Sequence, residues 1–197
     1  MGEVGQPRHI GFCRISCNLT ALKISLILYP IMNTKEELFE NCVQQFVKLT
    51  QKKFGQSLKC VILFGSTVKN LKVKTDIDLF VILENDLAKE MLFQFMDDAE
   101  NELRPFLAVA KAAGFEWAPS IKLKSKRQAL KFNPLYLDWI QTSRVLYADA
   151  ENLDQVILTR TKAFIQKYGS KRIEKGLFWY WDICPGLTYS EVIEYQW

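Results

Sequence analysis

Two short polar groups in an apolar stretch of the sequence have the residue types and spacing for phosphate and metal chemistry. The first is Gly65-Ser66, which directly follows the apolar run 59–64, and the second is the pair Asp76 and Asp78, separated from Ser66 by nine residues. Glycine lacks a Cβ and lets the backbone approach a ligand closely. A helix that begins just after Ser66 would add free N–H groups for a phosphate. The sequence therefore predicts an anion site at the end of this run.

Asp76 and Asp78 are two residues apart, so on a strand both side chains point to one face while Ile77, Leu79 and Val81 point to the other. Two carboxylates about 4 Å apart repel by roughly 4 kcal/mol at an effective dielectric constant of 20. A divalent cation removes this cost, and Mg²⁺ accepts one or two carboxylates plus substrate phosphates as ligands. The alternative is an Asp-x-Asp that only opens a strand in solvent. The neighbouring Gly-Ser pair and the lysine-rich spacer favour the metal site.

The hydrophobic pattern places these groups in an α/β domain. Thr34 and Glu37 form a capping box that predicts a helix from Thr34 to about Phe54, ended by Gly55. The apolar runs predict four strands, the second of them central: Lys59–Phe64, Asp76–Leu83, Glu116–Leu123 and Arg144–Tyr147. Further helices are predicted over Leu87–Ala113 with a break near Pro105 and a stop at Gly114, over Pro134–Thr142, and over Leu153–Tyr168 closed by Gly169. Alternating helices and strands indicate an α/β (α+β) fold, a mixed twisted sheet flanked by helices.

Residues 63–83, LFGSTVKNLKVKTDIDLFVIL, resemble the signature of the polymerase-β-type nucleotidyltransferase superfamily, in particular its minimal nucleotidyltransferases of the small prokaryotic branch. That signature is Gly-Ser, a spacer, and Asp-x-Asp followed by apolar residues. The later strings NPLYLD at 133–138, RVLYAD at 144–149 and WYWD at 179–182 are similar to segments of one prokaryotic branch. The resemblance covers residues 35–195 and implies a palm-like nucleotidyltransferase fold.

The resemblance also implies roles for individual residues. Gly65 and Ser66 would hold the triphosphate of an incoming NTP, and Asp76 and Asp78 would be the catalytic carboxylates that bind Mg²⁺ (or Mn²⁺). Lys69 stands where the family often has Arg and would contact phosphate. The implied reaction transfers a nucleoside monophosphate from the NTP to a hydroxyl acceptor, on a nucleic acid or a protein, and releases pyrophosphate.

Three departures from the family pattern support a second hypothesis. The nine-residue spacer is one residue short, and Asn70 replaces a common Gly. Active members usually carry a third carboxylate on the strand after the long helix, but here residues 120–122 are Ser-Ile-Lys and Glu116 is the only acid on that strand. Asp138 is expected to be a surface or capping residue. The second hypothesis is a catalytically weak or inactive nucleotide-binding relative that acts as an antitoxin, with a small helical toxin as its partner.

Composition restricts the class of protein further. The chain has 197 residues, 49% of them hydrophobic and 24% charged, which is typical of a globular protein. Two basic runs without an acid, at 48–75 and 122–131, suggest a polyanionic partner or two solvated faces. Five irregularly spaced cysteines and a single histidine argue against a zinc site and fit a reducing cytoplasm. The apolar stretch 19–32 is too short to span a bilayer, so no membrane partner is expected.

The two ends of the chain are interpreted separately. Residues 1–31 are expected to be an N-terminal extension or a wrongly assigned start, and residues 32–197 the nucleotidyltransferase-like domain with an aromatic C-terminal tail. In that tail, Phe178–Trp181 could stack a nucleobase, but packing against the core is the favoured expectation.

Overall fold

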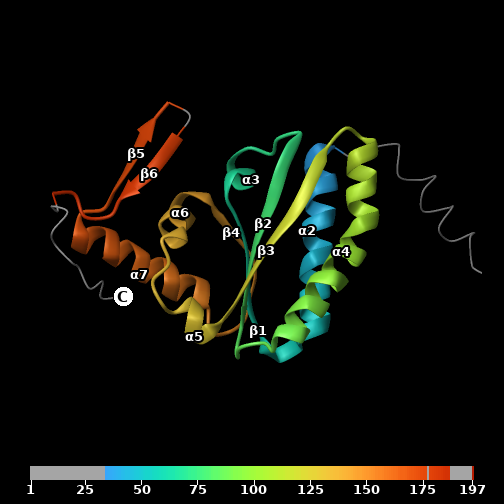
Figure 1. Ribbon diagram of the computed structural model, residues 1–197, viewed down its shortest axis with the longest axis horizontal. Helices are drawn as coiled ribbons and strands as arrows, with labels where there is room; N and C mark the ends of the chain where they lie inside the picture. The colour runs from blue at the N-terminus through green and yellow to red at the C-terminus, as the bar shows by residue number, and fades with distance from the viewer. Residues whose placement is uncertain (1–33, 177, 187–196) are drawn as a thin grey trace, which may run out of the picture. The chain divides into compact units, whose positions relative to one another are not determined.

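The computed structural model describes residues 34–176, 178–186 and 197, and the predicted extension 1–31 lies outside them. In this part of the chain a four-stranded mixed sheet has helices on both faces, as predicted (Figure 1). The strands are β1 Leu58–Phe64, β2 Lys74–Leu83, β3 Glu116–Ser125 and β4 Ser143–Ala148, with β5 Lys171–Lys175 and β6 Phe178–Asp182 in a separate pair. The helices are α2 Lys35–Phe54, α3 Ser66–Lys69, α4 Lys89–Ala112, α5 Lys126–Ala129, α6 Leu135–Thr142 and α7 Leu153–Tyr168.

The strand order is β3-β2-β1-β4, so β2 is an internal strand, as expected from its apolar second half. β1 pairs antiparallel with both β2 and β4, whereas β2 and β3 run parallel. A parallel pair needs a long crossover, and α4 supplies it. The predicted capping box is confirmed: the Thr34 hydroxyl accepts from the Glu37 N–H at 3.2 Å, and the Glu37 carboxylate accepts from the Thr34 N–H at 2.8 Å.

The predicted break in the long helix at Pro105 is wrong. α4 continues through Pro105 from Lys89 to Ala112. Proline removes the hydrogen bond to the carbonyl four residues earlier, which is that of Asn101. Because Pro105 and Asn101 are both exposed, water can satisfy the freed carbonyl. Gly114, with a φ of 90°, follows the end of the helix as predicted.

The core lies on both faces of the sheet, because alternate residues of β2 point in opposite directions. Ile77, Leu79, Val81 and Leu83 pack against α2 and α4 in one cluster. Phe80 and Ile82 pack on the other face in a second cluster, whose helical members include Tyr136, Trp139 and Ile157. The Phe80 and Trp139 rings meet edge to face, with centroids 4.9 Å apart. The buried second face determines where α6 and α7 lie.

The aromatic tail differs from the expectation. β5 and β6 pair antiparallel as a hairpin that sequence reasoning did not predict. Phe178, Trp179 and Tyr180 are exposed and lie outside both core clusters, so the expected packing of these three residues is wrong. The apolar face of the sheet opposite α2 and α4 is already covered by α6 and α7, which leaves these rings no place in the core.

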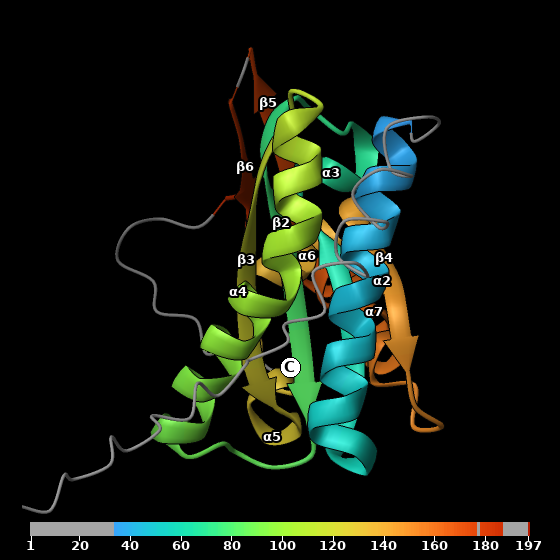
Figure 2. The same ribbon diagram turned by 90° about the vertical axis from the view of Figure 1, so that its right-hand side faces the viewer.

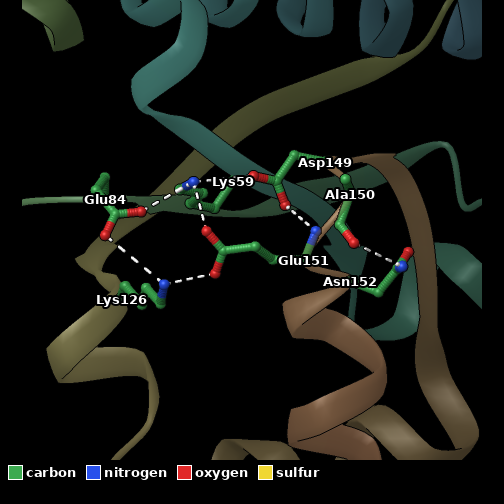
Figure 3. A network of polar contacts seen from close by, with 7 residues as sticks. All are labelled: Lys59, Glu84, Lys126, Asp149, Ala150, Glu151 and Asn152. Carbon is green, nitrogen blue, oxygen red and sulfur yellow. Dashed lines mark hydrogen bonds and ion pairs between the residues drawn. The ribbon is translucent and has the colours of Figure 1, made fainter.

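Part of the two basic runs is used for ion pairs inside the fold (Figure 3). Lys59 lies 2.8–3.0 Å from carboxylate oxygens of Glu84, Asp149 and Glu151, and Lys126 lies 2.5 Å from Glu151. Lys59 lies on β1 and Lys126 begins α5. Their ion pairs connect these two elements to the end of β2 and to the turn after β4. A run of positive charge in the sequence is therefore not one free basic surface in the fold.

Among the described residues, no helix combines the length and the apolar character that crossing a bilayer requires.

Replacing Glu151 by Gln should lower the melting temperature at pH 7. Hydrogen bonds from Lys126 and then Lys59 lower the pKa of Glu151 from its ordinary value of 4.5. A carboxyl whose folded pKa is lowered stabilises the fold above its ordinary pKa, and this contribution is lost as the pH falls through the folded value. Thermal unfolding of both proteins at several pH values should show a difference that is complete at pH 7 and shrinks below pH 4.5. A difference independent of pH would contradict this account.

Candidate active site

The chain reverses direction at Gly65, between β1 and α3, and this turn lies directly against β2. Phe64 at the end of β1 pairs in register with Asp78. Gly65 has a φ of 85°, and a Cβ added to it would lie 2.6 Å from Oδ2 of Asp78. No other residue type fits this place without moving the carboxylate. The Gly-Ser turn and one of the two predicted carboxylates are therefore in contact.

Helix α6 holds this turn in place. The Gly65 N–H donates to the carbonyl of Thr142, the last residue of α6, at 3.0 Å. Thr142 Oγ1 in turn donates to the carbonyl of Asp138, one helical turn earlier, at 2.8 Å. The last turn of α6 is thus fixed to the end of β1 by hydrogen bonds.

Helix α3 begins at Ser66, as the anion-site prediction requires, but it is short and ends at Lys69. Ser66 and Lys69 are exposed, whereas Thr67 is buried. Asn70 follows with a φ of −151° and a ψ of 109°, which is ordinary extended backbone. The backbone at Asn70 therefore does not need the glycine that is common at this position in the family.

Asp76 and Asp78 lie on the same face of β2, on the side where α6 and α7 cover the rest of the strand. Asp76 is exposed, and the Asp78 side chain keeps 25% of its accessible surface. Two carboxylates on one face beside a turn without a Cβ are a donor set that Mg²⁺ accepts, with phosphate oxygens and water completing its shell. The described residues contain no group of three or more His, Cys, Asp or Glu side chains able to hold a metal. A metal here would therefore depend on this pair and on the substrate.

The third carboxylate of the family pattern has no counterpart on β3. In the parallel register Asp78 pairs with Ser120, and Lys74 pairs with Glu116. The Glu116 carboxylate, at the start of β3, lies 3.2 Å from Nζ of Lys74 and forms an exposed ion pair with it. The only acid of this strand therefore lies opposite Lys74 and not opposite Asp78.

A lysine approaches the carboxylates instead. Nζ of Lys122, on β3, lies 4.0 Å from Oδ1 of Asp78 and 5.1 Å from the centre of the Phe64 ring. Sequence reasoning assigned Lys122 only to a basic run. Its contact with Asp78 could be found only through the register of β2 and β3, which local sequence patterns do not specify.

Asp138 is not the surface or capping residue that was expected. It lies half-buried on α6, and Oδ1 accepts a hydrogen bond from Trp181 Nε1 at 2.9 Å. Burial raises the pKa of Asp138, while the Trp181 hydrogen bond and the positive charges of Arg172 and Lys69 act in the opposite direction. Asp138 therefore contacts the β5–β6 hairpin, although the sequence separates it from Trp181 by 43 residues.

Comparison with known families agrees with the site. Residues 44–111 match the family model described as polymerase beta, nucleotidyltransferase, and this range includes the Gly-Ser turn and both aspartates. This segment of the chain is therefore similar to nucleotidyltransferases of the polymerase-beta type. A protein of Methanocaldococcus jannaschii is 29% identical over 147 residues, which are 73% of this chain and 95% of the relative. That relative carries the provisional name of a protein adenylyltransferase.

Two solved structures show more distant likeness. A spectinomycin adenyltransferase from Enterococcus, with ATP and spectinomycin, has a TM-score of 0.46 at 13% identity over 66% of this chain and 68% of its own. An antitoxin in complex with a tri-AMPylated toxin of Shewanella oneidensis has a TM-score of 0.43 at 16% identity, over 65% of this chain and 87% of that chain.

Replacing Gly65 by Ala should lower the free energy of unfolding by about 1–3 kcal/mol, because the backbone there has a conformation that only glycine adopts readily. It should also remove metal-dependent nucleotide binding, since the new Cβ would displace the Asp78 carboxylate. Urea unfolding and nucleotide titration measure the two effects. Gly114→Ala is the control, because Gly114 has a φ of 90° but open space where its Cβ would lie. It should be destabilised and still bind nucleotide. Equal binding by both variants would contradict the role of the Gly65 contact.

Proposed function

We propose that this protein is a metal-dependent nucleotidyltransferase that moves a nucleoside monophosphate from an NTP to a hydroxyl group of an acceptor. The observation that carries the proposal is the contact between the Asp78 carboxylate and the Cβ-less turn at Gly65. It brings a position for a hard cation next to a position for an anionic group. Phosphoryl chemistry requires these two positions side by side, because its catalysis is mostly positioning and charge stabilisation.

Different residues of the site bind different parts of the substrate. The backbone at Gly65, the hydroxyl of Ser66 and the ammonium of Lys69 bind the triphosphate and hold it in line for displacement. Asp76 and Asp78 hold Mg²⁺ (or Mn²⁺), which when bound would neutralise charge on the reacting phosphate and the pyrophosphate leaving group. Lys122 is close enough to Asp78 to supply a further positive charge for the same phosphates.

The acceptor hydroxyl must lose its proton during the transfer. No carboxylate occupies the place on β3 where the family pattern has one, because Ser120 pairs with Asp78 there. We therefore propose slow transfer, or proton removal by a group of the acceptor itself. The name of the M. jannaschii relative makes ATP and a protein hydroxyl the first donor and acceptor to test.

The second candidate function is a nucleotide-binding relative without transferase activity that acts as an antitoxin beside a small helical toxin. Ser120 and Lys122 favour this non-catalytic function. Ser120 lies opposite Asp78 and Lys122 lies beside it, and neither is an acid that could activate the acceptor hydroxyl. Both candidates require nucleotide binding at the same turn, and they differ in whether transfer occurs.

The double replacement of Asp76 and Asp78 by Asn should lower metal-dependent NTP affinity at least tenfold and abolish transfer, because it removes both anionic metal ligands without changing side-chain size. Calorimetric titration with and without Mg²⁺ measures the binding. Glu116→Gln is the matched control, an acid on the same face of the neighbouring strand that lies beside Lys74. It should bind and react as the natural protein does. Unchanged affinity in the double variant would refute the site.

A search for donor and acceptor separates the two candidates. We expect one NTP with Mg²⁺ to raise the melting temperature, since a ligand that binds only the folded state stabilises it. Incubation with that labelled NTP, Mn²⁺ and candidate RNA or protein acceptors should then transfer label. Tight NTP binding without transfer to any acceptor would leave the non-catalytic function.

A further inference from the structure

The β5–β6 hairpin lies at the same end of the sheet as the candidate site. Figure 1 shows it beside α6, on the sheet face opposite α2 and α4, and in Figure 2 it again extends past the end of the sheet where α3 lies. This is the end at which β1 finishes and β2 begins. The hairpin and the Gly65 turn thus lie at the same end of the sheet.

Two hydrogen bonds fix the hairpin to α6. Trp181 Nε1 donates to Asp138 at 2.9 Å, and the Arg172 guanidinium donates to the side-chain oxygen of Gln141 at 3.0 Å. Gln141 precedes Thr142, whose carbonyl accepts the Gly65 N–H. The hairpin is therefore connected to the predicted triphosphate turn through two successive residues of one helix.

The hairpin has two different faces. Trp179 and Trp181 alternate with Phe178 and Tyr180, so the first two share the face that is fixed to α6. The Arg172 guanidinium lies 4.8 Å from the centre of the Trp179 ring. Trp179 nevertheless keeps 48% of its accessible surface, close to the 49% of Tyr180 on the opposite face. A half-exposed indole ring that a guanidinium holds in place is a stacking surface for a planar ring.

We propose that Trp179, on the α6-facing side of the β5–β6 hairpin, binds the nucleobase of the NTP whose triphosphate lies at Gly65-Ser66. The inference rests on the proposed function and adds the place of the base to it. A nucleobase fits because it is flat and aromatic, and because the rest of its nucleotide is tethered at the turn to which α6 joins the hairpin. Asp138 acts as a positioning residue, since its hydrogen bond to Trp181 holds this face of the hairpin against α6.

The test compares a ligand that has a base with one that lacks it. The full chain, with Mg²⁺, is titrated calorimetrically with ATP and with inorganic tripolyphosphate. Trp179→Ala should weaken ATP binding about tenfold, the loss expected for one stacked base, and should leave tripolyphosphate binding unchanged. Trp179→Phe should keep most of the ATP affinity, because a ring remains.

Matched variants separate stacking from damage to the fold. Tyr180→Ala removes an equally exposed ring from the opposite face and should change neither affinity. Asp138→Leu removes the acceptor for Trp181 and should weaken ATP but not tripolyphosphate, whereas Asp138→Asn keeps an acceptor oxygen and should restore ATP affinity.

The outcomes are distinct for the two proposals. Suppose that the natural protein binds both ATP and tripolyphosphate. If the Trp179→Ala variant then binds ATP with unchanged affinity, or loses affinity for both ligands equally, the base site is wrong while the proposed function stands. If Tyr180→Ala weakens ATP binding as much as Trp179→Ala does, the stacking face is wrong. If the natural protein binds neither ligand, both the base site and the proposed function fail.

Discussion

The contact between the Asp78 carboxylate and the missing side chain of Gly65 is the constraint on which the arrangement depends. It exists because β1 and β2 pair antiparallel with Phe64 opposite Asp78. A slip of one residue in this register would turn the carboxylates toward α2 and α4, and Leu79 and Val81 toward the face covered by α6 and α7. The two apolar clusters on opposite faces of the sheet therefore fix the site as well as the fold.

The same alternation explains why the site is polar at one end of a buried strand. On the face of β2 that carries the carboxylates, Phe80 and Ile82 are fully buried under α6 and α7. Asp76 and Asp78 continue that row beyond the cover of these helices, where they keep access to solvent. Helix α6 ends at this boundary, and its last carbonyl binds the Gly65 turn. One face of β2 thus contributes buried residues to the core at one end and solvent-accessible carboxylates to the site at the other.

Local sequence signals were sufficient for most of the elements, and long-range contacts account for what they missed. The capping box at Thr34, the stop at Gly169 and the alternation in β2 each involve residues a few positions apart, and the predicted elements formed there. Pro105 was overinterpreted because its solvent exposure, which makes the lost hydrogen bond inexpensive, is a property of the folded chain. The role of Lys59 in an ionic network depends on partners up to 92 residues away. The position of Asp138 against Trp181 depends on a pairing across 43 residues.

Lys122 bears on how the two neighbouring carboxylates of β2 are tolerated in the folded protein. Its ammonium lies 4.0 Å from Asp78, and with 46% of the Lys122 side chain exposed the attraction is screened by water. Exposed ion pairs of this kind contribute about 1 kcal/mol or less. That is enough to reduce the repulsion between the two aspartates, and too little to exclude a divalent cation brought in with a triphosphate. If the proposed nucleotide binds here, a lysine at this place could turn from the carboxylate to a phosphate, whereas an acid there would add a third negative charge beside the two aspartates.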